Sequence, residues 1–178
     1  MHRLFFALQP NDSVAMQIAQ ATAIAKAAKF FRGACLQPKM QHITLAFLGD
    51  HEELPAAIVQ RAQLAAATVK FAPFSFSLAI VASFRGRRPP CVLLASPGTD
   101  AMLQDFRQTL CAALVTAGLG AHLDRRFTPH LTLAYGDKAV AQRLPVEPIV
   151  WPVREFVLLD SRVGHSIHAP LGCWPLSA

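Results

Sequence analysis

The sequence has no long apolar run, although hydrophobic residues make up 53% of its 178 positions. No stretch approaches the roughly 18 consecutive apolar residues that a membrane-spanning helix needs. The apolar segment from Leu4 to Leu8 is also too short for the core of a signal peptide, and polar residues follow it at once. We therefore expect a cytoplasmic protein that does not associate with a membrane.

Cysteine and charge are both sparse. The four cysteines, at positions 35, 91, 111 and 173, form no C-x-x-C pair and are too few for a secreted disulfide scaffold, so we expect them to be reduced. Charged residues make up only 16%, which argues against a disordered chain or a coiled coil. The 17 Lys and Arg exceed the 11 Asp and Glu, and a net charge of +6 favours contact with phosphates and RNA.

Apolar spacing and turn residues predict intermixed helices and strands without a long linker. The helices are expected from Asn11-Asp12-Ser13 to about Lys29, from Glu52-Glu53-Leu54-Pro55 with its acids in the first turn to about Val69, and from Thr99-Asp100 to a C-terminal cap at Gly118. The strands are expected at Leu4–Leu8, His42–Leu48, Phe74–Val81, Cys91–Ala95, His130–Tyr135 and Phe156–Asp160. This pattern predicts an α+β or α/β fold, with residues 1–178 as one domain of two closely packed lobes.

One short sequence occurs twice, 88 residues apart. Residues 42–50 read His-Ile-Thr-Leu-Ala-Phe-Leu-Gly-Asp and residues 130–137 read His-Leu-Thr-Leu-Ala-Tyr-Gly-Asp. Each copy is His-x-Thr-Leu-Ala-aromatic, followed by Gly-Asp. A match at this many fixed offsets indicates two related halves.

Strand geometry gives the repeat a chemical meaning. Residues i and i+2 project from the same face of a strand, so each histidine shares a face with its threonine. Phe47 and Tyr135 have the opposite parity, and we expect them to pack in the core. Because an unpaired imidazole and hydroxyl are costly to bury, the His–Thr pairs are expected to face a cleft between the lobes.

Two His–Thr pairs suit the opening of a cyclic phosphate. The reference pKa of histidine, about 6.5, makes both protonation states accessible near neutrality, so one imidazole can act as general base and the other as general acid. The threonine hydroxyls can donate hydrogen bonds to the phosphate oxygens. This chemistry requires no metal and no cofactor.

Two motifs extend this interpretation to a family. The opening Arg3-Leu4-Phe5-Phe6-Ala7-Leu8 and the segment Phe127-Thr128-Pro129-His130-Leu131-Thr132-Leu133, together with the paired His-x-Thr motifs, resemble the two-histidine phosphoesterase superfamily. Within it the chain is similar to the bacterial and archaeal RNA 2′,3′-cyclic phosphodiesterases, also called 2′-5′ RNA ligases. The resemblance implies an α+β, bilobal, pseudo-twofold fold in which antiparallel sheets line a central cleft and helices pack outside.

The resemblance also implies the reaction and the site. It implies hydrolysis of RNA 2′,3′-cyclic phosphate to a 2′-phosphate end, with reversible 2′-5′ ligation as a side activity and no metal. We assign His42 as proton donor and His130 as general base, with Thr44 and Thr132 as phosphate ligands; the near symmetry of the two copies leaves the reverse order open. Further candidate RNA contacts are Arg125, Arg126 and Lys39. We expect a monomer.

The chain departs from the family pattern at two places. Many members have arginine five residues after the second motif histidine, where this chain has Tyr135; Arg125, Arg126 or the Arg85/Arg87/Arg88 cluster can compensate. Near the C-terminus, Ser161 remains while His168 stands where the family often has tyrosine. His165 and His168 lie on a late strand or turn from which the cleft is within reach.

Three alternatives stay open at this point. A metal-dependent hydrolase could use His42 and His130 as ligands, but no H-E-x-x-H motif occurs and neither His-x-Thr motif contains an acid. A non-catalytic RNA-binding module would fit the net charge, but neither an aromatic-rich RNP motif nor a GXXG loop occurs. A 2′-5′ oligonucleotide phosphodiesterase of the same superfamily is the third.

Overall fold

The computed structural model describes residues 1–124, 126–162 and 164–178. Within them, eight strands form one antiparallel sheet in the order β6-β3-β4-β5-β2-β1-β7-β8. Its strands are β1 (His2–Leu8), β2 (Ile43–His51), β3 (Phe74–Ser83), β4 (Pro90–Ala95), β5 (His130–Tyr135), β6 (Leu144–Val153), β7 (Glu155–Arg162) and β8 (Ile167–Pro175). The helices are α1 (Asp12–Ala27), α2 (Ala56–Ala67) and α3 (Ala101–Thr116), with 3-10 turns η1 (Pro38–Met40) and η2 (Gly120–His122).

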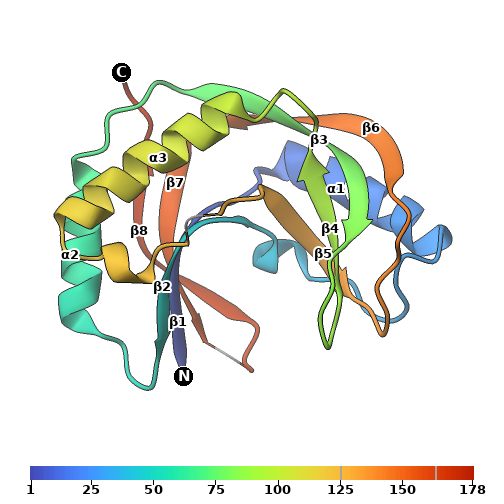
Figure 1. Cartoon of the computed structure of the whole chain (residues 1–178), viewed down its shortest axis with the longest axis horizontal. Coiled ribbons are helices and arrows are strands. Elements are labelled where there is room, and N and C mark those ends of the chain that lie inside the picture. Colours follow the sequence, from blue (N-terminus) through green and yellow to red (C-terminus); the bar gives the residue numbers. More distant parts are fainter. Residues whose placement is uncertain (125, 163) are drawn as a thin grey trace.

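The sheet consists of two four-stranded lobes. The first lobe is β2-β1-β7-β8 and the second is β6-β3-β4-β5, and the two meet where β2 pairs with β5 at the position Ile43–Leu131. Each lobe contains the same chain path, β1-α1-η1-β2 in the first and β4-α3-η2-β5 in the second. The implied α+β fold with antiparallel strands is confirmed, and the strands form one continuous sheet (Figure 1).

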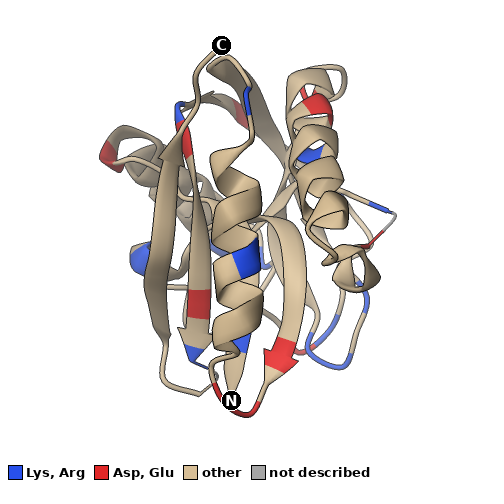
Figure 2. Ribbon diagram, turned by 90° about the vertical axis from the view of Figure 1, so that its left-hand side faces the viewer, with Lys and Arg blue, Asp and Glu red and all other residues tan. Residues whose placement is uncertain are grey.

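The helices cover the outer face of the sheet, and α1 crosses to the lobe that does not contain the strand before it. Helix α1 packs against β6 of the second lobe, although it follows β1 of the first. Helices α2 and α3 lie side by side, with α2 against β8 and α3 against β2 and β3 (Figure 2). The buried face of α3 consists of Leu103, Phe106, Leu110 and Leu114. No helix in the described residues is long and apolar enough to cross a membrane.

Two strands and one helix start differ from the sequence prediction. Strands β6 and β8 were not predicted, because β6 has prolines at 145, 148 and 152 and β8 has little polar alternation. Both are edge strands, where a missing backbone N–H is tolerated. The prediction that Glu52 and Glu53 lie in the first turn of a helix is wrong: β2 continues to His51 and α2 begins only at Ala56. The cap at Gly118 is confirmed by its φ of +74°.

Phe106 of α3 joins the two lobes through the core. Its ring lies 5.7 Å from that of Phe74 on β3 and 5.3 Å from that of Phe156 on β7, measured between centroids. These partners belong to different lobes, and Phe106 is fully buried. The aromatic cluster therefore holds the two halves of the sheet at a fixed angle.

We predict that Phe106→Ala lowers the free energy of unfolding by about 3–5 kcal/mol, because it leaves a cavity between the lobes. Met102 on the same helix is 42% exposed, so Met102→Ala should change stability by no more than about 0.5 kcal/mol. Urea unfolding followed by circular dichroism measures both values. Equal losses in the two variants would contradict the assigned role of Phe106.

Candidate active site

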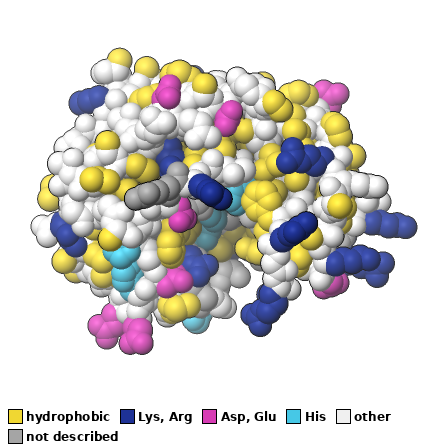
Figure 3. All heavy atoms as spheres, viewed as in Figure 1, with side chains coloured by type: hydrophobic (Ala, Val, Ile, Leu, Met, Phe, Trp, Pro, Cys, Tyr) yellow, Lys and Arg dark blue, Asp and Glu magenta, His cyan; other side chains and the backbone are white. Residues whose placement is uncertain are grey.

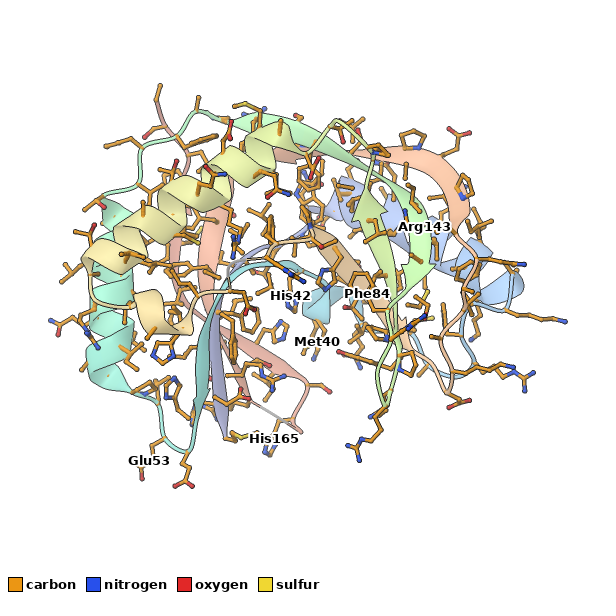
Figure 4. The ribbon with its side chains drawn as sticks, in the orientation of Figure 1. Met40, His42, Glu53, Phe84, Arg143 and His165 are labelled. Carbon is orange, nitrogen blue, oxygen red and sulfur yellow. The ribbon has the colours of Figure 1, made fainter. Side chains whose placement is uncertain are left out.

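A cavity of about 590 Å³ lies between the two lobes, where β2 and β5 diverge from their paired position. It is lined by both motif histidines and both motif threonines: His42, Thr44, His130 and Thr132. Figure 3 shows histidine side chains in the hollow at the centre of the molecule, and Figure 4 shows His42 and Met40 beside it. The structure therefore brings together the two copies of the repeat.

The register at the junction sets how the motifs face each other. Ile43 pairs with Leu131 in antiparallel orientation, and both side chains are fully buried in the core. Their neighbours along each strand project to the opposite face, which is the cavity. Antiparallel order then sets His42 alongside Thr132, and His130 alongside Thr44, across the junction. Each histidine thus lies next to the threonine of the other copy.

Each histidine ring is held by an equivalent hydrogen bond to a backbone carbonyl two residues earlier in the chain. Nδ1 of His42 donates to the carbonyl oxygen of Met40 at 2.8 Å, and Nδ1 of His130 donates to the carbonyl oxygen of Thr128 at 2.7 Å. A carbonyl only accepts, so Nδ1 carries the proton in each ring. This fixes the tautomer and leaves Nε2 as the nitrogen available to a bound molecule.

The two histidines have different surroundings. His42 stacks on Phe5, with ring centroids 4.7 Å apart, and meets His168 edge-on at 4.9 Å. Burial lowers the pKa of His42 to about 4; charge on His168 or His130 acts in the same direction, and the hydrogen bond to Met40 opposes it. His42 is therefore neutral at pH 7 when the cavity is empty. His130 contacts only the edge of Phe84 among the aromatic rings of the described residues, at 4.9 Å.

The threonine hydroxyls are available to a ligand. Thr44 and Thr132 are half-buried, and within the described part of the chain neither hydroxyl is hydrogen-bonded to another residue. Hydroxyls in such positions can donate to the oxygens of an anion. The two lie on opposite sides of the junction, as phosphate ligands from both halves would.

The prediction that Phe47 and Tyr135 face the core is wrong, because both strands contain a β-bulge. In β2, Ala7 pairs with Thr44 and Phe6 with Ala46, so Leu45 is the extra residue. In β5, Leu133 is extra in the same way, between Thr132 and Ala134. A bulge shifts the alternation by one residue, so both aromatic side chains line the cavity together with the histidines.

Two arginines that the sequence analysis did not select as site residues line the cavity. Arg3 lines it and makes a bidentate ion pair with Asp50, at 2.7 and 2.8 Å. Arg162 also lines it, with Nε 4.0 Å from a carboxylate oxygen of Asp160. Strand alternation could have indicated Arg3, since Arg3, Phe5 and Ala7 share one face of β1. The position of Arg162 depends on the pairing of β7 with β1, which the sequence does not reveal.

Two of the three candidate RNA contacts, Arg126 and Lys39, lie outside this cavity. Arg126 is exposed and does not line the cavity, while Arg125 lies outside the described residues. Lys39 lines a separate cavity of about 470 Å³ beside Trp151 and Arg154. Arg88 of the hairpin lies over the ring of Tyr135, with its guanidinium carbon 5.6 Å from the centroid.

His168, which the sequence places within reach of the cleft, lies on β8 and lines the cavity. It pairs with Ser161 across β7 and β8, and both residues line the cavity. Its ring also meets Phe5 edge-on at 5.5 Å, and its Nδ1 is buried without a hydrogen-bond partner among the described residues. Burial lowers the pKa of His168. No group of three or more His, Cys, Asp or Glu in the described residues is arranged to hold a metal ion.

Comparisons with known proteins identify the family and the fold. A family model for the 2′-5′ RNA ligase superfamily matches residues 10–165. The chain is 37% identical over 125 residues to an RNA 2′,3′-cyclic phosphodiesterase of Geobacillus stearothermophilus, a match that covers 66% of this chain. The chain spans only 39% of the length of that relative.

Similar solved structures include Escherichia coli LigT in its apo form, with a TM-score of 0.78 at 23% identity over 99% of this chain and 98% of LigT. LigT complexed with 3′-AMP has a TM-score of 0.73 at 25% identity over the same shares. A Thermus thermophilus protein has a TM-score of 0.75 at 23% identity, over 98% of this chain and 97% of that one. These likenesses support the fold.

We predict that His168→Ala raises the pKa of His42 from about 4 toward its ordinary value, because water then reaches the His42 ring. An NMR titration of the His42 Cε1–H signal measures this midpoint. His122→Ala, an exposed position outside the cavity, is the control and should leave the midpoint unchanged. An unaltered midpoint in the His168 variant would mean that Phe5 alone desolvates His42.

Proposed function

Because the chain belongs to the 2′-5′ RNA ligase superfamily, we propose that it hydrolyses the 2′,3′-cyclic phosphate end of RNA to a 2′-phosphate. One observation carries this proposal. Two imidazoles with the same tautomer share one cavity with two free hydroxyls, and each imidazole presents Nε2 as its reactive nitrogen. Such a set of groups suits a displacement at phosphorus, in which the attacking water must lose a proton and the leaving oxygen must gain one. The substrate follows the name of the Geobacillus relative.

The proposed reaction is an in-line displacement at phosphorus. Nε2 of His130 takes a proton from water as the water oxygen attacks phosphorus. The bond from phosphorus to O3′ breaks on the opposite side, and Nε2–H of His42 gives its proton to O3′. The product has a 2′-phosphate and a free 3′-hydroxyl, while His130 is left protonated and His42 neutral. Solvent then restores both proton states.

The other cavity residues support the phosphate. Thr44 and Thr132 donate hydrogen bonds to the two non-bridging oxygens, where charge increases as water adds. Arg3, held in place by Asp50, supplies positive charge at the edge of the cavity. All of these groups come from one chain, so the proposal needs no second copy. It also assigns no step to a metal or cofactor.

Phe47 and Tyr135 are proposed to contact the terminal base. Both line the cavity because of the two bulges, and Tyr135 is 47% exposed. Aromatic faces stack on any base, so this contact holds the nucleoside without selecting its identity. In 2′-5′ ligation a 5′-hydroxyl replaces water as the nucleophile at the cyclic phosphate, and the same two imidazoles remove its proton and protonate the leaving O3′.

We predict that His42→Asn and His130→Asn each lower kcat by about 10²- to 10⁴-fold on an RNA ending in 2′,3′-cyclic phosphate. The measurement is product formation with excess chelator present, which should leave the wild-type rate unchanged. His51→Asn, outside the cavity, is the matched control and should retain full activity. Full activity in both test variants would contradict the assignment, and a 3′-phosphate product would contradict the leaving group.

The acid–base order makes a separate prediction. His42 is neutral in the empty cavity, so it can donate a proton only if the bound phosphate raises its pKa. We predict that saturating 2′-AMP raises the NMR midpoint of His42 by at least about one unit, because an anion beside the ring favours the imidazolium. Uridine, which lacks the phosphate, is the control. If 2′-AMP leaves the midpoint near 4, His42 must be the base and His130 the acid.

A further inference from the structure

A second cavity of about 430 Å³ opens on the second lobe, beside the candidate active site. Its walls come from the end of β3, from Leu94 of β4 and from the connection between β5 and β6 at residues 139–143. Phe84 belongs to this second cavity and also meets His130 edge-on, at 4.9 Å between centroids. In Figure 4, Phe84 lies between His42 and Arg143. Phe84 of the second cavity therefore contacts His130 of the candidate active site directly.

We propose that this second cavity binds the nucleotide that precedes the cyclic phosphate in a single-stranded RNA. The inference rests on the proposed function, and it adds a subsite for the chain of the substrate. A strand whose last ribose lies at His130 must leave the active site over a neighbouring surface. Because Phe84 contacts His130, the second cavity is such a neighbouring surface.

The floor of the second cavity suits a base. Ala82 and Leu94 form an apolar cluster with Val92, and Phe84 packs at its edge. This cluster lies on the inner face of the sheet and is separate from the core under the helices. An apolar floor with an aromatic edge can bury a base face of any sequence, while Ser83 and Gln142 at the wall offer hydrogen-bonding groups.

The rim of the second cavity suits a phosphodiester. Arg85 and Arg143 line it from opposite walls, and no acidic residue does so among the described residues. Neither arginine has an ion pair with a described carboxylate, in contrast to Arg3 and Arg162 in the active site. Arg87 and Arg88 are exposed on the same hairpin as Arg85. Free guanidinium groups around an apolar floor match the alternation of phosphate and base along an RNA strand.

The test compares two substrates in one enzyme. We expect wild-type protein to hydrolyse a tetranucleotide ending in 2′,3′-cyclic phosphate with a KM at least about tenfold below that for 2′,3′-cyclic AMP. Arg85→Glu combined with Arg143→Glu should raise the tetranucleotide KM about tenfold or more, leave kcat unchanged, and leave both constants for cyclic AMP unchanged. A double variant that keeps the tetranucleotide advantage would overturn the subsite.

The control and a salt series sharpen the result. Arg61 on α2 is exposed and lies outside both cavities. Arg61→Glu should therefore leave kcat and KM for both substrates unchanged, which excludes a general charge effect.

A salt series tests the phosphate contact at Arg143. With Arg143→Ala, the slope of log(kcat/KM) for the tetranucleotide against log salt should fall by about 0.7 in magnitude, as for one lost phosphate contact. An unchanged slope would count against a phosphate at Arg143. Failure of wild-type protein on both substrates would instead overturn the proposed function, and the RNA subsite with it.

Discussion

One backbone pair, Ile43 with Leu131, determines the geometry of the candidate site. Each residue directly follows a motif histidine, and each buries its side chain in the core. The core therefore fixes the register at the position where β2 and β5 pair. A slip by one residue would turn one histidine toward the core and a leucine or isoleucine into the cavity. Because an imidazole without a partner is costly to bury, the hydrophobic core and the site select the same register.

The sequence predicted the parts of the site that depend on local periodicity. His42, Thr44, His130 and Thr132 follow from a repeat with a two-residue spacing, and the structure brings all four to one cavity. Phe47 and Tyr135 were misplaced, because a bulge adds a residue without any local signal in a run of apolar residues. The same Leu-Ala pair is buried in both copies, so the bulge belongs to the repeat. His168 and Arg162 required the pairing of β7 with its neighbours, which is not local information.

The fold shows the same division between local and non-local information. Helices and central strands have strong periodic patterns and were predicted to within a few residues. Strand β6 carries three prolines, and proline is tolerated in a strand mainly at the edge of a sheet. Only the assembled sheet shows that β6 is an edge strand. The packing of α1 on β6 of the other lobe is also a tertiary property, which the apolar spacing along the helix does not reveal.

The arginines of the active cavity lie near carboxylates, whereas those of the proposed RNA subsite have no ion pair with a described carboxylate. In the active cavity, Asp50 neutralises much of the charge of Arg3, and Asp160 lies 4.0 Å from Arg162. A strong positive field there would oppose the proposed protonation of His130, and it would lower the pKa of His42 further. The arginines of the proposed RNA subsite, Arg85 and Arg143, lie instead on the β3–β4 hairpin and on the β5–β6 connection, and neither lines the active cavity. In the proposed mechanism they can attract a polyanion strongly without disturbing the proton transfers, because they are not the charges that surround the phosphate at the histidines.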